Sequence, residues 1–83
     1  MYPRSVGALQ ADALFASALQ HGDEPDISQV WHAIALALDA YGGTGCAGRV
    51  AQEFGDHPET AAARMRWARQ TLAGLAFRVR LAA

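Results

Sequence analysis

Residues 25–43 contain the start, the apolar face and the end of one helix. Asp26 is followed three residues later by Gln29, directly after Pro25, and this spacing is typical of a capping box. Apolar residues then recur at helical spacing on one broad face: Ile27, Val30, Trp31, Ile34, Ala37, Leu38 and Tyr41. Gly42 and Gly43 follow, and glycine readily adopts the left-handed conformation that ends a helix. The segment therefore predicts a helix from Asp26 to Tyr41.

A first helix is predicted over residues 6–20, with Ser5 as its N-cap. Its apolar residues fall on one face, and Asp12 and Ser17 lie off that face. The apolar set is Ala8, Ala11, Leu14, Phe15, Ala18 and Leu19. Residues 21–25 are polar and include both glycine and proline, so we expect them to form the linker between the first two helices.

Two more helices are predicted in the second half of the chain. Thr44 is placed to cap a third helix that ends before Gly55. Asp56 and Glu59 then repeat the capping-box spacing at the start of a fourth helix, which is predicted to reach about Phe77. The apolar residues of this helix alternate by four and three, as in a heptad seam: Ala61, Met65, Ala68, Leu72, Leu75 and Val79. Residues 77–81 alternate apolar and charged side chains, so helix, strand and tail all stay open for them.

The chain has 83 residues, of which 19 are alanine. Alanine is the best helix former but buries little surface, which favours helices packed closely through small faces. We therefore expect one all-α domain over residues 1–83, a compact bundle of about four short helices. The scarcity of large apolar side chains also favours a homodimer.

Charge is distributed unevenly along the chain. Residues 1–48 carry one arginine against five acidic residues, a balance of −4, whereas residues 49–83 carry six arginines against three acidic residues, a balance of +3. The net charge of −1 gives no overall attraction to nucleic acid or to a membrane. No apolar run is long enough to span a membrane and no signal-peptide pattern is present, so we expect a cytoplasmic protein.

Residues 46–72 contain the pattern of a helical hairpin with a glycine at its turn. Ala51 is a small residue on the first helix, and Gly55 follows four residues later. The second helix carries a threonine, a small apolar residue, and an arginine beside an apolar residue: Thr60, Ala61, Arg64 and Met65. In these residues the segment resembles the DNA-binding helix-turn-helix of sigma-factor region 4 and related response-regulator domains. Two positions depart from that family, because Asp56 and Ala61 stand where an apolar residue and a branched residue are usual.

The resemblance implies binding to duplex DNA through the start of the predicted fourth helix. Thr60 and Arg64 would contact the major groove, and Arg66 and Arg69 would contact phosphates. The alternatives are a hairpin with a purely structural role and a solvated helix face whose arginine stems cover apolar surface.

A protein interface is the alternative function, from a different class. It would use apolar residues of the C-terminal helix and leave nucleic acid unbound: Trp67, Leu72, Leu75, Phe77 and Val79. Trp67 fits equally well as a buried residue at the edge of the bundle, and burial of that kind is also expected for Trp31. The salt dependence of binding distinguishes the two functions, because affinity for phosphates falls steeply as the salt concentration rises, whereas the affinity of an apolar contact hardly changes.

No arrangement of residues favours an enzyme, a metal site or a cofactor. His21, His32, His57 and Cys46 do not pair at the spacings that metal ligands use. Cys46 lies on an apolar stripe and is the only cysteine, which excludes a disulfide within the chain. Residues 42–45 lack the preceding strand and the lysine of a phosphate-binding loop. We expect a small non-enzymatic binding module; a small-molecule pocket between the helices is a third possibility, for which no polar anchor is apparent.

Overall fold

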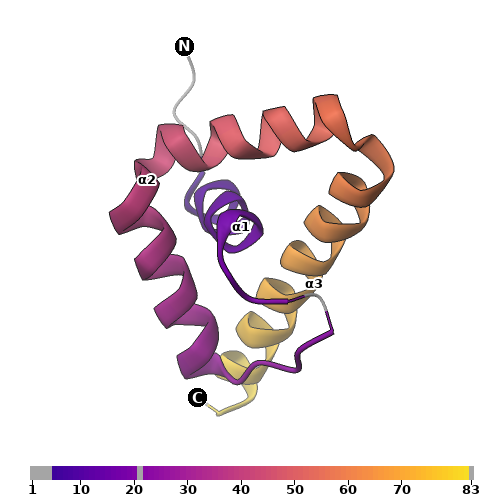
Figure 1. The fold of residues 1–83 in the computed structure, drawn as a ribbon. Helices are drawn as coiled ribbons and strands as arrows, with labels where there is room; N and C mark the ends of the chain where they lie inside the picture. The colour runs from indigo at the N-terminus through magenta and orange to yellow at the C-terminus, as the bar shows by residue number, and fades with distance from the viewer. Residues whose placement is uncertain (1–4, 21, 83) are drawn as a thin grey trace.

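The computed structural model describes residues 5–20 and 22–82, and for residues 78–82 it describes the helical backbone alone. These residues form three helices, α1 (Val6–Ala16), α2 (Ile27–Asp56) and α3 (Pro58–Ala82) (Figure 1). The described part of the chain contains no strand, which confirms the all-α prediction. The prediction of four helices is wrong, because the expected second and third helices are the two parts of α2.

A kink at Gly42 is the reason that α2 contains two predicted helices. Gly42 has φ 67° and ψ 171° inside α2, a conformation that is essentially restricted to glycine. The sequence signal for a helix end at this position therefore corresponds to a sharp change of direction, after which the helix resumes. We call residues 27–41 the N-terminal arm of α2 and residues 43–56 its C-terminal arm.

Helix α1 lies at the centre of the molecule, and the two arms of α2 and helix α3 run around it on three sides (Figure 1). Five consecutive residues of α1, from Ala11 to Phe15, are buried. A helix that packs on one side alone buries only a stripe, so this continuous burial follows from the central position of α1. Asp12 is only 3% exposed, and the prediction that it lies off the buried face is wrong for the same reason.

Helix α1 ends at Ala16, four residues before the predicted end at residue 20. The carbonyl oxygen of Leu14 accepts hydrogen bonds from the backbone N–H of Ser17 at 3.2 Å and from its hydroxyl at 2.6 Å. A serine side chain that bonds to the backbone in this way competes with continued helix. The chain consequently leaves α1 in an extended conformation at Ser17.

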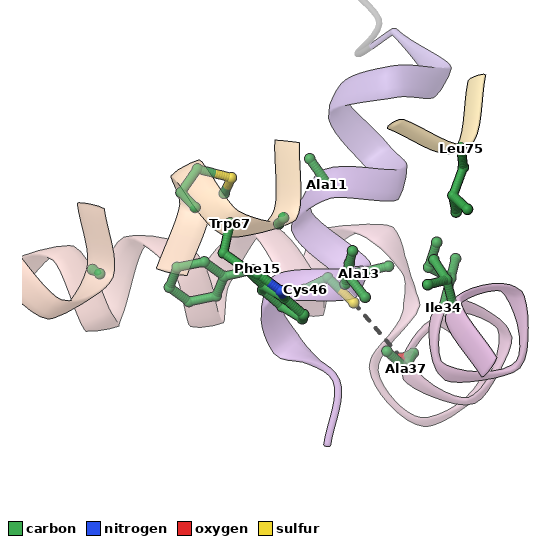
Figure 2. Packing of buried hydrophobic residues seen from close by; sticks show 13 residues of the cluster. Ala11, Ala13, Phe15, Ile34, Ala37, Cys46, Trp67 and Leu75 are labelled. Carbon is green, nitrogen blue, oxygen red and sulfur yellow. Dashed lines mark hydrogen bonds between the residues drawn. The ribbon is translucent and has the colours of Figure 1, made fainter. Parts of the chain in front are cut away.

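The core combines small side chains, five of them alanine, with six large ones: Leu14, Phe15, Ile34, Met65, Trp67 and Leu75 (Figure 2). The heptad seam of α3 faces this core through Ala61, Met65, Ala68 and Leu75, as the four-three spacing predicts. Val79 belongs to the same predicted seam, but its side chain lies outside the described residues. The thiol of Cys46 donates to the carbonyl oxygen of Ala37 at 3.6 Å, a contact that joins the two arms across the kink (Figure 2).

Two of the four predicted helix caps form. The hydroxyl of Ser5 accepts from the backbone N–H of Ala8 at 3.0 Å, and Asp26 and Gln29 make both hydrogen bonds of a capping box, at 2.8 and 2.9 Å. The other two predicted caps are wrong, because Thr44 lies inside α2 and Asp56 is its last residue. The single residue His57 separates α2 from α3.

Candidate functional site

Arg64 reaches from α3 to the C-terminal end of α1 and binds its backbone carbonyl groups. Its Nε donates to the oxygen of Phe15 at 2.7 Å, and its Nη2 donates to those of Ser17 at 3.0 Å and Leu19 at 2.9 Å, with Leu14 at 3.5 Å. The last carbonyls of a helix lack partners within the helix and carry partial negative charge. Helix α1 has no basic residue in its last turn, so Arg64 supplies the missing cation from another helix.

Two aromatic rings also contact the guanidinium of Arg64. Its Cζ lies 4.9 Å from the ring centroid of Trp67 and 5.8 Å from that of Phe15. Burial lowers the pKa of Arg64 from its ordinary value, although an arginine stays charged in proteins. Arg64 therefore holds α1, residues 17–19 and α3 together with one partly desolvated positive charge.

The other residues predicted to contact DNA lie on the surface. Thr60, Arg66 and Arg69 are exposed on α3, whereas Arg64 is half-buried and engaged with α1. The corner that precedes them differs from the expected turn, because Gly55 is helical and Gly42 is the only described glycine with a positive φ. Ala51, expected to lie between the two helices of the hairpin, is exposed.

The residues predicted to form a protein interface separate into two groups. Trp67 is 8% exposed and Leu75 is 4% exposed, and Leu72 packs against the same core, so these three already have their contacts within one chain. Phe77 is 62% exposed and is available to a partner. The sequence also predicted burial of Trp31, which is instead exposed on the N-terminal arm.

A largely apolar groove lies between residues 16–19 and the N-terminal arm of α2. Its volume is about 420 Å³. The arm contributes Ala33, Ala40 and two large side chains that remain accessible, Leu36 at 56% and Tyr41 at 39%. We call this the apolar groove. Sequence reasoning missed it because its residues were assigned to a face buried in the bundle or to no face at all.

A second cleft, of about 430 Å³, lies on the other side of residues 16–18, between α1, the C-terminal arm and the start of α3. Its polar side chains come from segments far apart in the sequence: Ser17, Gln20, Arg49, Gln52, Glu53, Thr60 and Arg64. The guanidinium of Arg49 lies 3.7 Å from the ring centroid of Tyr41. We call this the polar cleft. The sequence showed no polar residues placed to bind a small molecule between the helices, whereas the fold brings such residues together here.

Cys46 is fully buried and is poorly suited to act as a nucleophile. Burial raises the pKa of its thiol, and the negative charge of Asp12 raises it further, against a smaller opposite effect of Arg49. A raised pKa reduces the thiolate fraction that reacts. The described residues contain no group of three or more histidine, cysteine or acidic side chains placed to hold a metal ion. None of the helices, over the described residues, has the length and apolar character needed to cross a membrane.

Comparison with known proteins provides no functional assignment. No protein-family model matches the chain, and searches of curated proteins and of solved structures found no match.

Proposed function

We propose that the protein is a non-enzymatic interaction module that associates with itself through the apolar groove. The observation that carries this proposal is the pair of accessible apolar side chains, Leu36 and Tyr41, at an open groove whose lining also includes five alanines. Grooves of this kind accept the apolar face of a helix or a single large side chain.

The C-terminal part of α3 has the properties that such a groove requires. Phe77 exposes a large ring there, and residues 60–83 contain five arginines and no acidic residue. Residues 5–48, which include the arm that lines the groove, contain five acidic residues and no arginine or lysine. In a second copy, Phe77 would enter the groove and the opposite charges would orient the two chains. A two-fold dimer would repeat this contact twice.

Sedimentation equilibrium of the purified chain tests the proposal with two variants. Leu36→Glu places a charge in the groove and Phe77→Glu places one on the inserted side chain, so each variant alone should remain monomeric. An equimolar mixture of the two should associate again, because the intact Phe77 of one variant fits the intact groove of the other.

The matched control is Ala35→Glu, an exposed position on the same arm that does not line the groove. It should associate like the parent chain. A parent chain that stays monomeric at high concentration, or a mixture that associates no better than its components, contradicts self-association through this groove.

Duplex DNA is a second candidate partner, favoured by the exposure of Arg66 and Arg69 three residues apart on α3. In this case Thr60 remains a candidate groove contact, whereas the side chain of Arg64 would have to leave α1 to reach a base. Fluorescence anisotropy with labelled genomic fragments in about 50 mM salt measures the binding, and two phosphate contacts predict a log–log salt slope of roughly −2. Replacing Arg66 and Arg69 with glutamate should abolish it. No binding by the parent chain would exclude this candidate.

A further inference from the structure

The polar cleft brings two arginine side chains to one concave surface. Arg49 comes from the C-terminal arm of α2 and Arg64 from α3, and among the described residues Glu53 is the only acidic one that lines the cleft with them. The formal charge of the lining is therefore +1. Thr60 adds a hydroxyl, and Gln20 and Gln52 add amide groups that can donate hydrogen bonds.

Both guanidinium groups are held in place by contacts that leave donors available. The stacking of Arg49 on the ring of Tyr41 uses the face of the guanidinium and not its N–H groups. Within the described residues, the hydrogen bonds that Arg64 donates leave from Nε and Nη2, so its Nη1 has two N–H groups left. Positioning before binding lowers the entropy cost of ordering a side chain around a ligand.

The environment of Arg64 favours an anion further. Its partners in the described structure are main-chain carbonyls and aromatic rings, and burial lowers its pKa, which means that its charge is incompletely solvated. Planar guanidinium groups bind carboxylate and phosphate oxygens with two parallel hydrogen bonds. The volume of about 430 Å³ is within the range of sites for small molecules.

We propose that the polar cleft binds a small anionic ligand, whose carboxylate or phosphate group accepts hydrogen bonds from Arg49 and Arg64. Thr60 and the two glutamines would contact its remaining polar atoms. The proposal does not require self-association, because all five side chains belong to one chain and none of them lines the apolar groove. The two clefts are neighbours, however, since residues 16–18 line both and Tyr41 of the groove contacts Arg49.

Titration of the ¹⁵N-labelled full chain, followed by amide chemical shifts, tests the site with two probes. Pyrophosphate represents phosphate ligands and citrate represents carboxylate ligands, each added at constant ionic strength so that general screening stays equal. We expect saturable shifts confined to residues 15–20, 49–53 and 60–64 with at least one probe. The probe that saturates identifies the chemical class, and saturation with both indicates a cleft that accepts either group.

The variant Arg49→Gln tests the assignment without disturbing the end of α1, because Arg49 is exposed and makes none of the contacts of Arg64. It should weaken binding about tenfold or more, the effect of losing a hydrogen bond to a charged group. The control Arg66→Gln removes an equal charge from an exposed position outside the cleft and should leave the affinity unchanged. Shifts that stay linear with both probes, or equal affinity in Arg49→Gln and Arg66→Gln, would overturn the proposal.

Discussion

The guanidinium of Arg64 fills the place that a basic residue in the last turn of α1 would otherwise take. It belongs to a helix that begins more than forty residues later, and yet it bonds to carbonyl oxygens of residues 14, 15, 17 and 19. A side chain with this role contributes to the fold through its geometry as well as its charge. Lysine has the charge without the planar fork, so the two residues are not equivalent here.

Replacement of Arg64 should therefore destabilise the protein. Arg64→Ala leaves several part-buried carbonyl oxygens without their donor and should lower the free energy of unfolding by about 2 kcal/mol. Arg64→Lys should restore only part of that loss. Urea denaturation measures both, with Arg66→Ala as the exposed control, expected within about 0.5 kcal/mol of the parent. Equal stability of the alanine variants would show that the contacts of Arg64 with α1 do not hold in solution.

The two predicted capping boxes, at Asp26 and Asp56, should respond differently to replacement by alanine. Asp26→Ala removes the acceptor for the backbone N–H of Gln29 and should cost about 1 kcal/mol. Asp56→Ala should be neutral or slightly stabilising, because Asp56 ends α2, where a negative charge opposes the helix dipole. Thermal or urea unfolding of the two variants side by side distinguishes a real cap from a matching sequence pattern. If Asp56→Ala instead lowers the free energy of unfolding by about 1 kcal/mol, Asp56 caps the start of a helix and the prediction is wrong.

Two glycines of α2 are expected to respond in opposite directions to alanine. Gly42→Ala forces a side chain into a conformation with φ 67° and ψ 171° and should destabilise by about 1 to 3 kcal/mol. Gly55 is helical with nothing within 4 Å of an added Cβ, so Gly55→Ala should stabilise by about 0.5 to 1 kcal/mol. A helix-turn-helix in which Gly55 forms the turn requires the reverse sign for Gly55. The unfolding free energies of both variants are the measurement.

The sequence predicted those features of the helices that are formed by residues close together in the chain. The caps at Ser5 and Asp26 and the special conformation at Gly42 each involve groups within a few positions of one another. Whether the chain ends or only bends after Gly42 depends instead on where the next segment can pack. The end of α1 combines both kinds of cause, since the local hydrogen bonds of Ser17 to Leu14 end the helix and the distant Arg64 binds the carbonyls of the extended residues that follow.

At the scale of the whole molecule, α1 contacts both of the other helices and each of those contacts the other. We predict that the chain unfolds in a single transition, because removing any helix exposes the buried residues of α1. In a Trp31→Phe background, the fluorescence of the buried Trp67 should report the same urea midpoint as far-UV circular dichroism. Separate midpoints for the two probes would mean that one helix leaves the structure before the others.

The two clefts are also properties of the whole molecule, which is why no sequence pattern predicted them. The polar cleft joins residues 15–20 to residues 49–64, and its most engaged side chain, Arg64, matched a DNA-binding pattern on local spacing. The spacing correctly placed Met65 and Ala68 toward the core, but it contains no information about which distant segment meets the opposite flank of α3.

The central position of α1 also has a consequence for the order in which the protein is made. Residues 11–15 are synthesised about fifty residues before residue 64, whose side chain binds the end of α1. At bacterial or eukaryotic elongation speeds, the ribosome needs roughly 2 to 10 seconds to add those fifty residues. During that interval the nascent α1 lacks α3 and the cation of Arg64, and a helix of 11 residues is unstable in water without such packing. We therefore expect α1 to stay unfolded on the ribosome, and accessible to chaperones, until α3 has been made.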